Sequence, residues 1–352
     1  VVLYAIASAI AWVFRNDDMR LTTFCSCGAH FIAFAGIGAS AEWQSAVADK
    51  VGTNFDELAV FTFVLIVAGF LGIMFLINYF AVRKQDDAKK YHSAIEELQL
   101  DIVGLVLSFV ITQAIRHTLT GNYPAMHLLQ VDGGMANDPT HDKPKAWQRN
   151  FMLGWAFLLI VLAAFLLPIL NDWAAGSTST VAHQWIHVLK VVLIMLIAWG
   201  FLLWGQWEFH EHLFPAEGLF GHMLFAILAT FVCLGVLVCM AKFSEVSTTR
   251  QAQQTYNIIT TGISLVAAWS WEHAFDEAFD IVGHEYQVGY KGLVPKLVLS
   301  IVVPAALLPI YLSHVRPRVK EFEEEHEERH KALPGGAAEQ GAAEQGAVEQ
   351  TA

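Results

Sequence analysis

The sequence predicts an all-α, polytopic membrane protein. Hydrophobic residues make up 55% of the 352 residues and charged residues only 15%, whereas soluble globular domains contain about 45–50% apolar residues. The apolar residues are gathered in blocks of about 20, the length that a helix needs to cross the ~30 Å core of a bilayer. The net charge of −12 disfavours nucleic-acid binding, because a phosphate-binding surface needs a basic face.

Eight complete spans are expected, each within one apolar block. They cover approximately residues 21–41, 58–82, 98–119, 151–173, 185–207, 219–241, 258–279 and 293–313. An apolar run over residues 1–14 precedes them. It is too short to span a bilayer, and we interpret it as the end of a truncated helix. Residues 1–315 are thus expected to form one transmembrane domain.

The distribution of lysine and arginine predicts the orientation of these spans. One alternating set of connections carries thirteen basic residues, and the other set carries six. The richer set, which includes residues 83–90 and the C-terminal segment, is therefore expected to be cytoplasmic. Residues 316–333 are expected to form a charged cytoplasmic helix. Residues 334–352 repeat the unit GAAEQ, which is too small and polar to bury a core, so this tail is expected to be disordered.

Every second span ends, on the predicted outer side, in a mixture of tryptophan, acid and histidine. The endings are Ser40–Ala46, Thr112–Gly121, Trp204–Phe214 and Trp269–Asp280. This spacing predicts a helical hairpin used four times, with its outer ends gathered around one axis. An interfacial aromatic belt would explain the tryptophans without any repeat, so both interpretations stay open.

The strongest local pattern lies in Trp269–Asp280. At 100° per residue, one face of a helix would carry Trp271, Phe275, Ala278 and Phe279. The other face would carry Glu272, His273, Asp276, Glu277 and Asp280. Such a column costs several kcal/mol per charge in hydrocarbon. It therefore either lines a path for cations or belongs to a helix that emerges into water.

A second cluster lies in Trp204–Phe214. Helical spacing places Glu208, Glu211 and His212 on one face, with Gln206 and His210 pointing elsewhere. We predict that this face belongs to the same ion pathway. A weaker alternative is a metal site made by Glu208, His212, His273 and Asp276. No familiar metalloenzyme motif is present, and no other cofactor is expected.

Gln113, Arg116 and His117 share one face near the outer end of the span at 98–119. Arg116 is the only arginine inside an apolar block. It is expected to pair with Glu208 or Glu272 of a neighbouring span, or else to snorkel to the interface. We predict that these three residues gate the pathway or supply its counter-charge.

These patterns favour an integral membrane channel or transporter for protons or small cations, with the acidic and histidine-rich outer helix ends forming its entrance. The partners expected are the lipid bilayer and the transported cation, and a homo-oligomer is left open. One alternative is a non-catalytic membrane scaffold or a lipid- or pigment-binding subunit. The other is a membrane-embedded, metal-dependent enzyme acting on lipid. The sequence contains none of the motifs typical of nucleotide-binding enzymes or of hydrolases with a nucleophile elbow.

Overall fold

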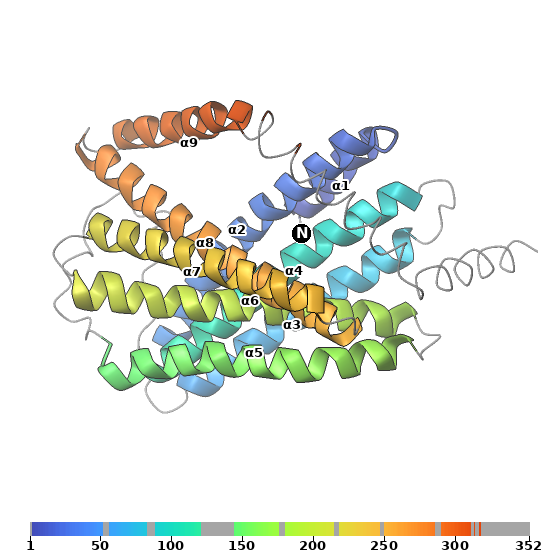
Figure 1. Cartoon of the computed structure of the whole chain (residues 1–352). Helices are drawn as coiled ribbons and strands as arrows, with labels where there is room; N and C mark the ends of the chain where they lie inside the picture. The colour runs from blue at the N-terminus through green and yellow to red at the C-terminus, as the bar shows by residue number, and fades with distance from the viewer. Residues whose placement is uncertain are drawn as a thin grey trace, which may run out of the picture. The chain divides into compact units, whose positions relative to one another are not determined.

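The computed structural model describes residues 2–51, 56–82, 89–120, 144–175, 180–214, 218–246, 250–285 and 290–310, together with Ser313 and Pro317. Within these ranges the chain is almost entirely helical and contains no strand (Figure 1). The helices are α1 (Val2–Val13), α2 (Asp18–Val51), α3 (Asp56–Val82), α4 (Lys89–Thr120), α5 (Ala146–Ala175), α6 (Thr180–Gly205), η1 (Gln206–Leu213), α7 (Gly218–Val246), α8 (Arg250–Glu285) and α9 (Tyr290–Ile310).

The chain divides into two compact units, Val1–Ala278 and Phe279–Ala352. The first unit contains every helix up to α7 and most of α8, and it holds the residues discussed below. The second unit contains α9. The predicted charged helix and GAAEQ tail lie outside the described residues, apart from Pro317.

Five helical segments of the described chain are long and apolar enough to cross a membrane, which indicates a multi-pass membrane protein. They are Arg20–Gln44, Lys90–Thr120, Ala146–Leu170, Trp185–Leu213 and Leu219–Met240. The predicted span at 58–82 corresponds to α3, in which a shorter apolar stretch is found, Phe61–Ile73. The predicted spans at 258–279 and 293–313 correspond to α8 and α9, and neither is among the five. The count of eight therefore stays a prediction.

Large apolar side chains cover the outward surfaces of α5 and α7. Phe165 and Phe231 are 71% and 68% exposed, and Phe157 and Val238 are also more than half exposed. A surface of this kind would be costly in water, because it leaves large apolar area hydrated. Lipid chains remove that cost, which is why these two helices can be apolar on their outer faces.

Two exposed tryptophans stand near the ends of α5. Trp147 and Trp173 are 57% and 62% exposed. They are 26 positions apart, which is about 39 Å at the helical rise of 1.5 Å per residue. That length approaches the ~40–45 Å of a bilayer with its interfaces, where tryptophan is enriched. Trp147 and Trp173 are therefore placed to anchor the two ends of α5 at the two membrane interfaces.

The helices α2, α4 and α6 run parallel, with α4 in contact with both of the others. Along α2 and α4, a Cβ added to Gly36 would lie 2.9 Å from Val106, and further on Gln44 Nε2 donates to the carbonyl oxygen of Val110 at 3.1 Å. Along α4 and α6, Phe109 packs edge-on against Trp199, with centroids 5.2 Å apart. The chain thereby places the outer ends of three predicted spans at the same end of the first unit.

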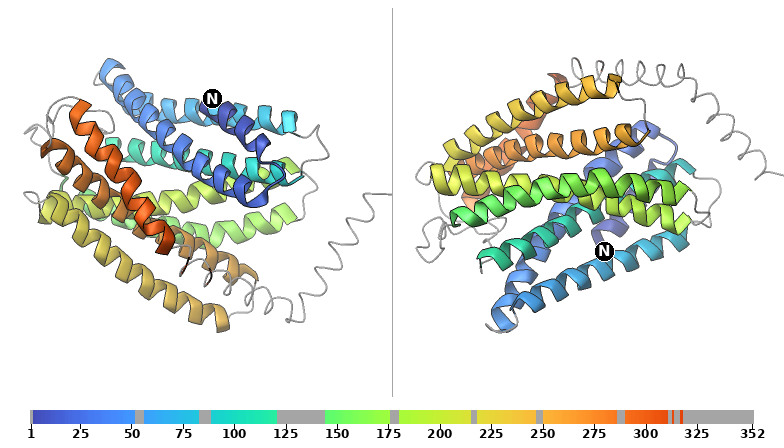
Figure 2. Two further views of the ribbon diagram at one scale, coloured as in Figure 1. Left: turned by 90° about the horizontal axis from the view of Figure 1, so that it is seen from above. Right: turned by 60° about the horizontal axis from the view of Figure 1, so that its bottom comes forward.

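Helix α8 runs parallel to α6. Trp199 stacks on Trp269 with ring centroids 4.3 Å apart, and Cys233 of α7 donates its thiol to the carbonyl oxygen of Ile263. The antiparallel helix α5 lies alongside α6, as Figure 1 and both views of Figure 2 show. The parallel order agrees with the predicted alternation of spans, but the repeated hairpin unit itself stays a prediction.

Small residues set the distance between α4 and α6, so enlarging one should separate the helices. A Cβ on Gly104 of α4 would overlap the side chain of Val191 in α6. Gly104→Ala should lower the free energy of unfolding in detergent by about 1–3 kcal/mol through overpacking. Gly235→Ala in α7 is the matched control. A Cβ there meets nothing within 4 Å, so the change should be neutral or stabilising by up to about 1 kcal/mol. Equal effects of the two substitutions would contradict the close approach of α4 and α6.

Candidate functional site

The α-helix α6 ends at Gly205 and continues as the π-helix η1. At its end the backbone N–H of Phe214 donates to the carbonyl oxygen of Phe209 at 3.1 Å, five residues earlier, where an α-helix would use the fourth. The wider turn of a π-helix changes which side chains share a face. Such segments are rare and are found frequently at functional sites.

The side chains of η1 face different neighbours. His210 faces α7, where its ring stacks on His222. Glu208 and His212 do stay together, with 3.8 Å between His212 Nδ1 and Glu208 Oε1.

Three histidine rings from three helices follow one another at this end. The ring centroids of His210 in η1 and His222 in α7 lie 4.4 Å apart, and those of His222 and His273 in α8 lie 6.4 Å apart, with interplanar angles of 29° and 25°. Gly221 permits the approach of α7, because a Cβ at this position would lie 2.9 Å from the carbonyl oxygen of Phe209. The imidazole rings of three helices are thus gathered at this end of the unit.

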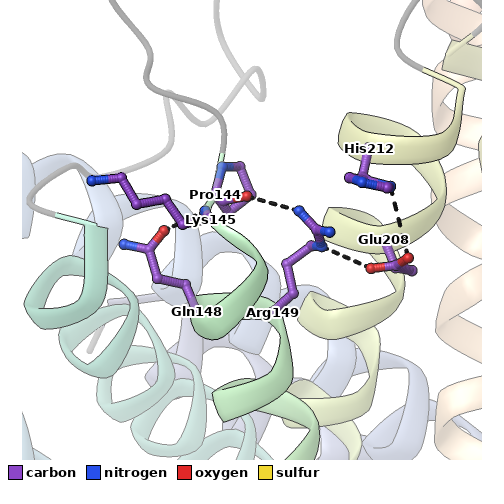
Figure 3. Close-up of polar contacts among 6 residues, drawn as sticks. All are labelled: Pro144, Lys145, Gln148, Arg149, Glu208 and His212. Atoms are coloured by element: carbon purple, nitrogen blue, oxygen red, sulfur yellow. Dashed lines mark hydrogen bonds and ion pairs between the residues drawn. The ribbon is translucent and has the colours of Figure 1, made fainter.

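A charged hydrogen bond connects α5 to η1 (Figure 3). Arg149 Nε donates to Glu208 Oε2 at 2.7 Å, and its Nη1 donates to the carbonyl oxygen of Pro144 at 2.9 Å. The two charged side chains are 12% and 27% exposed. An ion pair at this depth is worth more than a surface pair, because water screens it less.

The neighbouring Gln148 connects α5 to the end of α4. Its Oε1 accepts from the backbone N–H of Lys145 at 2.6 Å (Figure 3), and its Nε2 donates to the carbonyl oxygen of Leu119. Gln148 is buried, and both the oxygen and the nitrogen of its side-chain amide make hydrogen bonds. Gln148 and Arg149 together hold α4, α5 and η1 in one arrangement.

Arg116 lies beside η1, as part of the face that α4 presents near its end. Its guanidinium carbon is 5.5 Å from the ring centroid of Trp207, a residue that is 1% exposed. The expected pair with Glu208 is wrong, because Glu208 bonds to Arg149. Gln113 and His117 of the same face are buried.

Most of the acidic column of α8 is exposed. The buried residues at this end of α8 include Trp269, Ser270 and Ala274, whereas Phe275 of the predicted apolar face is 42% exposed. Trp269 stacks on Trp199 of α6, and this contact orients the buried face of α8. Glu272, His273 and Asp276 are exposed, Glu277 is half-buried, and the side chain of Asp280 lies outside the described residues. The cation path and the emerging helix both stay open as interpretations of this column.

Sequence reasoning missed Gln148 and Arg149, and it missed the stacking of His210 on His222. Arg149 lies between two predicted spans, where the sequence indicates no partner for it, and the contact of the two histidines depends on the close approach of α7 at Gly221. The alternative metal set of Glu208, His212, His273 and Asp276 stays a prediction. Among the described residues, no group of three or more His, Cys, Asp or Glu side chains is placed to hold a metal ion.

Comparisons with protein-family models, with curated proteins and with solved structures found no match for this chain. A functional conclusion must come from a site's own geometry and chemistry in any case, because one fold hosts many functions. Here that site is the end of the first unit where η1 contacts α7 and lies beside α4 and α5.

The ion pair between Arg149 and Glu208 should be measurable in a double-mutant cycle. We expect a coupling energy of about 1–2 kcal/mol for Arg149→Met combined with Glu208→Gln, because the pair is largely shielded from water. The matched control is the pair of Arg20 with Asp17, whose side chains are 70% and 47% exposed; its coupling should be about 0–0.5 kcal/mol. Chemical unfolding in detergent provides both values. Equal coupling in the two pairs would contradict a structural role for Arg149.

Proposed function

We propose that this chain is a membrane channel or transporter for protons or small cations, with its entrance at the end of the bundle that carries η1. The observation that carries the proposal is the series of three histidine rings from η1, α7 and α8. Stacked imidazoles cannot all hold a charge without repelling one another. A proton held by one ring is therefore easily passed on, whereas a purely structural role would be served equally well by phenylalanine.

Buried polar side chains on α4 support the same proposal. Gln99, Ser108, Thr112, Gln113 and His117 are all buried, although α4 is one of the five helices apolar enough to span a membrane. Polar groups at membrane depth are expensive, and they mark ion and proton pathways in membrane proteins. In this proposal Gln113, Arg116 and His117 supply the gate or counter-charge, and Glu208, Glu211 and His212 belong to the pathway.

The acids of α8 would attract cations to the entrance. Glu272 and Asp276 are exposed at the same end as His273, and with Glu277 and Asp280 they would raise the local cation concentration by electrostatic focusing. This role requires only that the acids face water, so it does not depend on their being buried.

The proposal includes the finer topology expected from the sequence. Eight spans, arranged as four hairpins with an incomplete helix before them, would place the C-terminal segment in the cytoplasm and η1 on the opposite side. The bias of basic residues supports this orientation. A homo-oligomer is compatible with it.

Labelling can test the orientation at two described positions. In a background with the four native cysteines replaced, a cysteine at Asn16 should react with a membrane-impermeant reagent only from the cytoplasmic side. A cysteine at Ala146 should react only from the other side. Asn16 lies just before the start of α2 and Ala146 is the first residue of α5, and α5 runs antiparallel to α6, which runs parallel to α2. Both original residues are exposed, so access is not limiting. Labelling of both from one side would overturn the topology.

Flux measurements in liposomes test the function. The double substitution Glu272→Gln with Asp276→Asn should lower cation flux by about tenfold or more, because the attraction at the entrance is lost. Asp172→Asn is the matched control: this exposed acid lies near the opposite end of α5 from Arg149, and its removal should leave flux at the entrance unchanged. A double variant that conducts like the parent would remove α8 from the entrance. A parent chain with no flux would favour the scaffold.

A further inference from the structure

Arg15 is held in one orientation where the end of α1 meets the start of α4. Its guanidinium carbon lies 4.5 Å from the ring centroid of Trp12, and its Nη1 donates to the carbonyl oxygen of Trp12 at 3.1 Å. The ring of Trp12 packs against Tyr91 of α4 at an interplanar angle of 87°, with centroids 5.0 Å apart. The hydroxyl of Tyr91 donates to the carbonyl oxygen of Ser8 at 3.0 Å. We call Trp12, Arg15 and Tyr91 the Arg15 cluster.

Arg15 keeps hydrogen-bond donors for a ligand. A guanidinium carries five N–H donors, and in the part of the chain that the structure describes this side chain makes one hydrogen bond, to Trp12. Asp17, the nearest acid along the chain, is engaged with Arg20. One of its carboxylate oxygens lies 3.1 Å from Nε of Arg20, and the other accepts from the backbone N–H of Arg20 at 3.1 Å. Arg15 is exposed, so an anion can reach donors that Asp17 does not occupy.

The Arg15 cluster stands at the depth of lipid headgroups. Two of the apolar segments long enough to cross a membrane begin close to it, Arg20–Gln44 and Lys90–Thr120, and Tyr91 is the second residue of the latter. Helix α1 has 12 residues and is therefore about 18 Å long. That length is close to one leaflet of the ~30 Å hydrocarbon core. Helix α1 is thus placed to run through one leaflet, with Arg15 at its headgroup end.

The outward face of α1 is apolar. The helix packs against α2 and α4, and its exposed large side chains are Leu3, Ile6, Ile10 and Val13. Their spacing puts them on one face of the helix. Ala5 and Ala9 are also exposed, and at 100° per residue they lie between this face and Trp12. These small side chains leave room for an acyl chain that runs along α1 toward Arg15.

We infer that the Arg15 cluster binds the headgroup of an anionic phospholipid, with an acyl chain of the same lipid along the outward face of α1. A planar guanidinium matches a phosphate through two parallel hydrogen bonds, and its contact with Trp12 reduces the entropy lost on binding. Phosphatidylcholine fits less well, because choline favours an aromatic face and Arg15 already covers that of Trp12. The predicted cytoplasmic side is also where anionic lipids are concentrated. This inference goes beyond the proposed function and does not depend on transport.

Binding can be measured on the full chain in dodecyl maltoside micelles. Phosphatidylglycerol or phosphatidylcholine is titrated in, and bound lipid is counted by native mass spectrometry. We expect phosphatidylglycerol to bind about fivefold tighter or more, the effect of one basic residue at a membrane surface. Equal affinity for the two lipids would overturn the inference. Inorganic phosphate in large excess should not displace phosphatidylglycerol, because it lacks the acyl chain; displacement would indicate a site for free anions and overturn the lipid assignment.

Substitutions assign the lipid to Arg15, whose exposed side chain can be changed without disturbing the core. Arg15→Gln should weaken phosphatidylglycerol binding about tenfold, because a charge-assisted contact is lost. Arg15→Lys keeps the charge but not the planar fork, so it should also weaken binding. The matched control, Lys242→Gln, removes one exposed charge near the end of α7 on the predicted cytoplasmic side and should not. The inference is overturned by parent-like binding in either Arg15 variant, or by equal losses in Arg15→Gln and Lys242→Gln.

Discussion

The packing of α4 against α2 and α6 is the constraint on which the rest of the first unit depends. These helices lie close because glycine stands at the contacts, at Gly36 against Val106 and at Gly104 against Val191. Between membrane helices there is little hydrophobic driving force, so close van der Waals contact and interhelical hydrogen bonds hold them together. The bond from Gln44 to the carbonyl oxygen of Val110 is one of these. The buried polar face of α4 is tolerated only because its neighbours shield it from lipid.

The π-helix η1 places the side chains of the candidate site at the end of these packed helices. Within this segment Glu208 points toward Arg149 of α5 and His210 points toward His222 of α7. Gly221 allows the backbone of α7 to approach η1. A single irregular segment therefore faces two neighbouring helices with different chemistry on each side.

The acids near the candidate site differ in whether a basic side chain balances their charge. The sequence suggests an acidic entrance, and the acids of α8 are indeed exposed. Glu208 of η1, by contrast, is bonded to Arg149 of α5. Exposed and paired acids thus stand near the same end of the unit. The exposed acids can attract cations from solution, whereas the charge of Glu208 is balanced by its partner.

The sequence by itself determined the class of the protein and the neighbourhood of its site. Apolar blocks of bilayer length are a local property, so the helices and their alternation could be predicted, and so could the concentration of acids, histidines and tryptophans at one end. Three contacts could not be predicted: the bond of Glu208 to Arg149, the stacking of His210 on His222, and the stacking of Trp269 on Trp199. Periodicity describes one helix at a time, whereas these contacts arise between helices, and only the tertiary structure decided them.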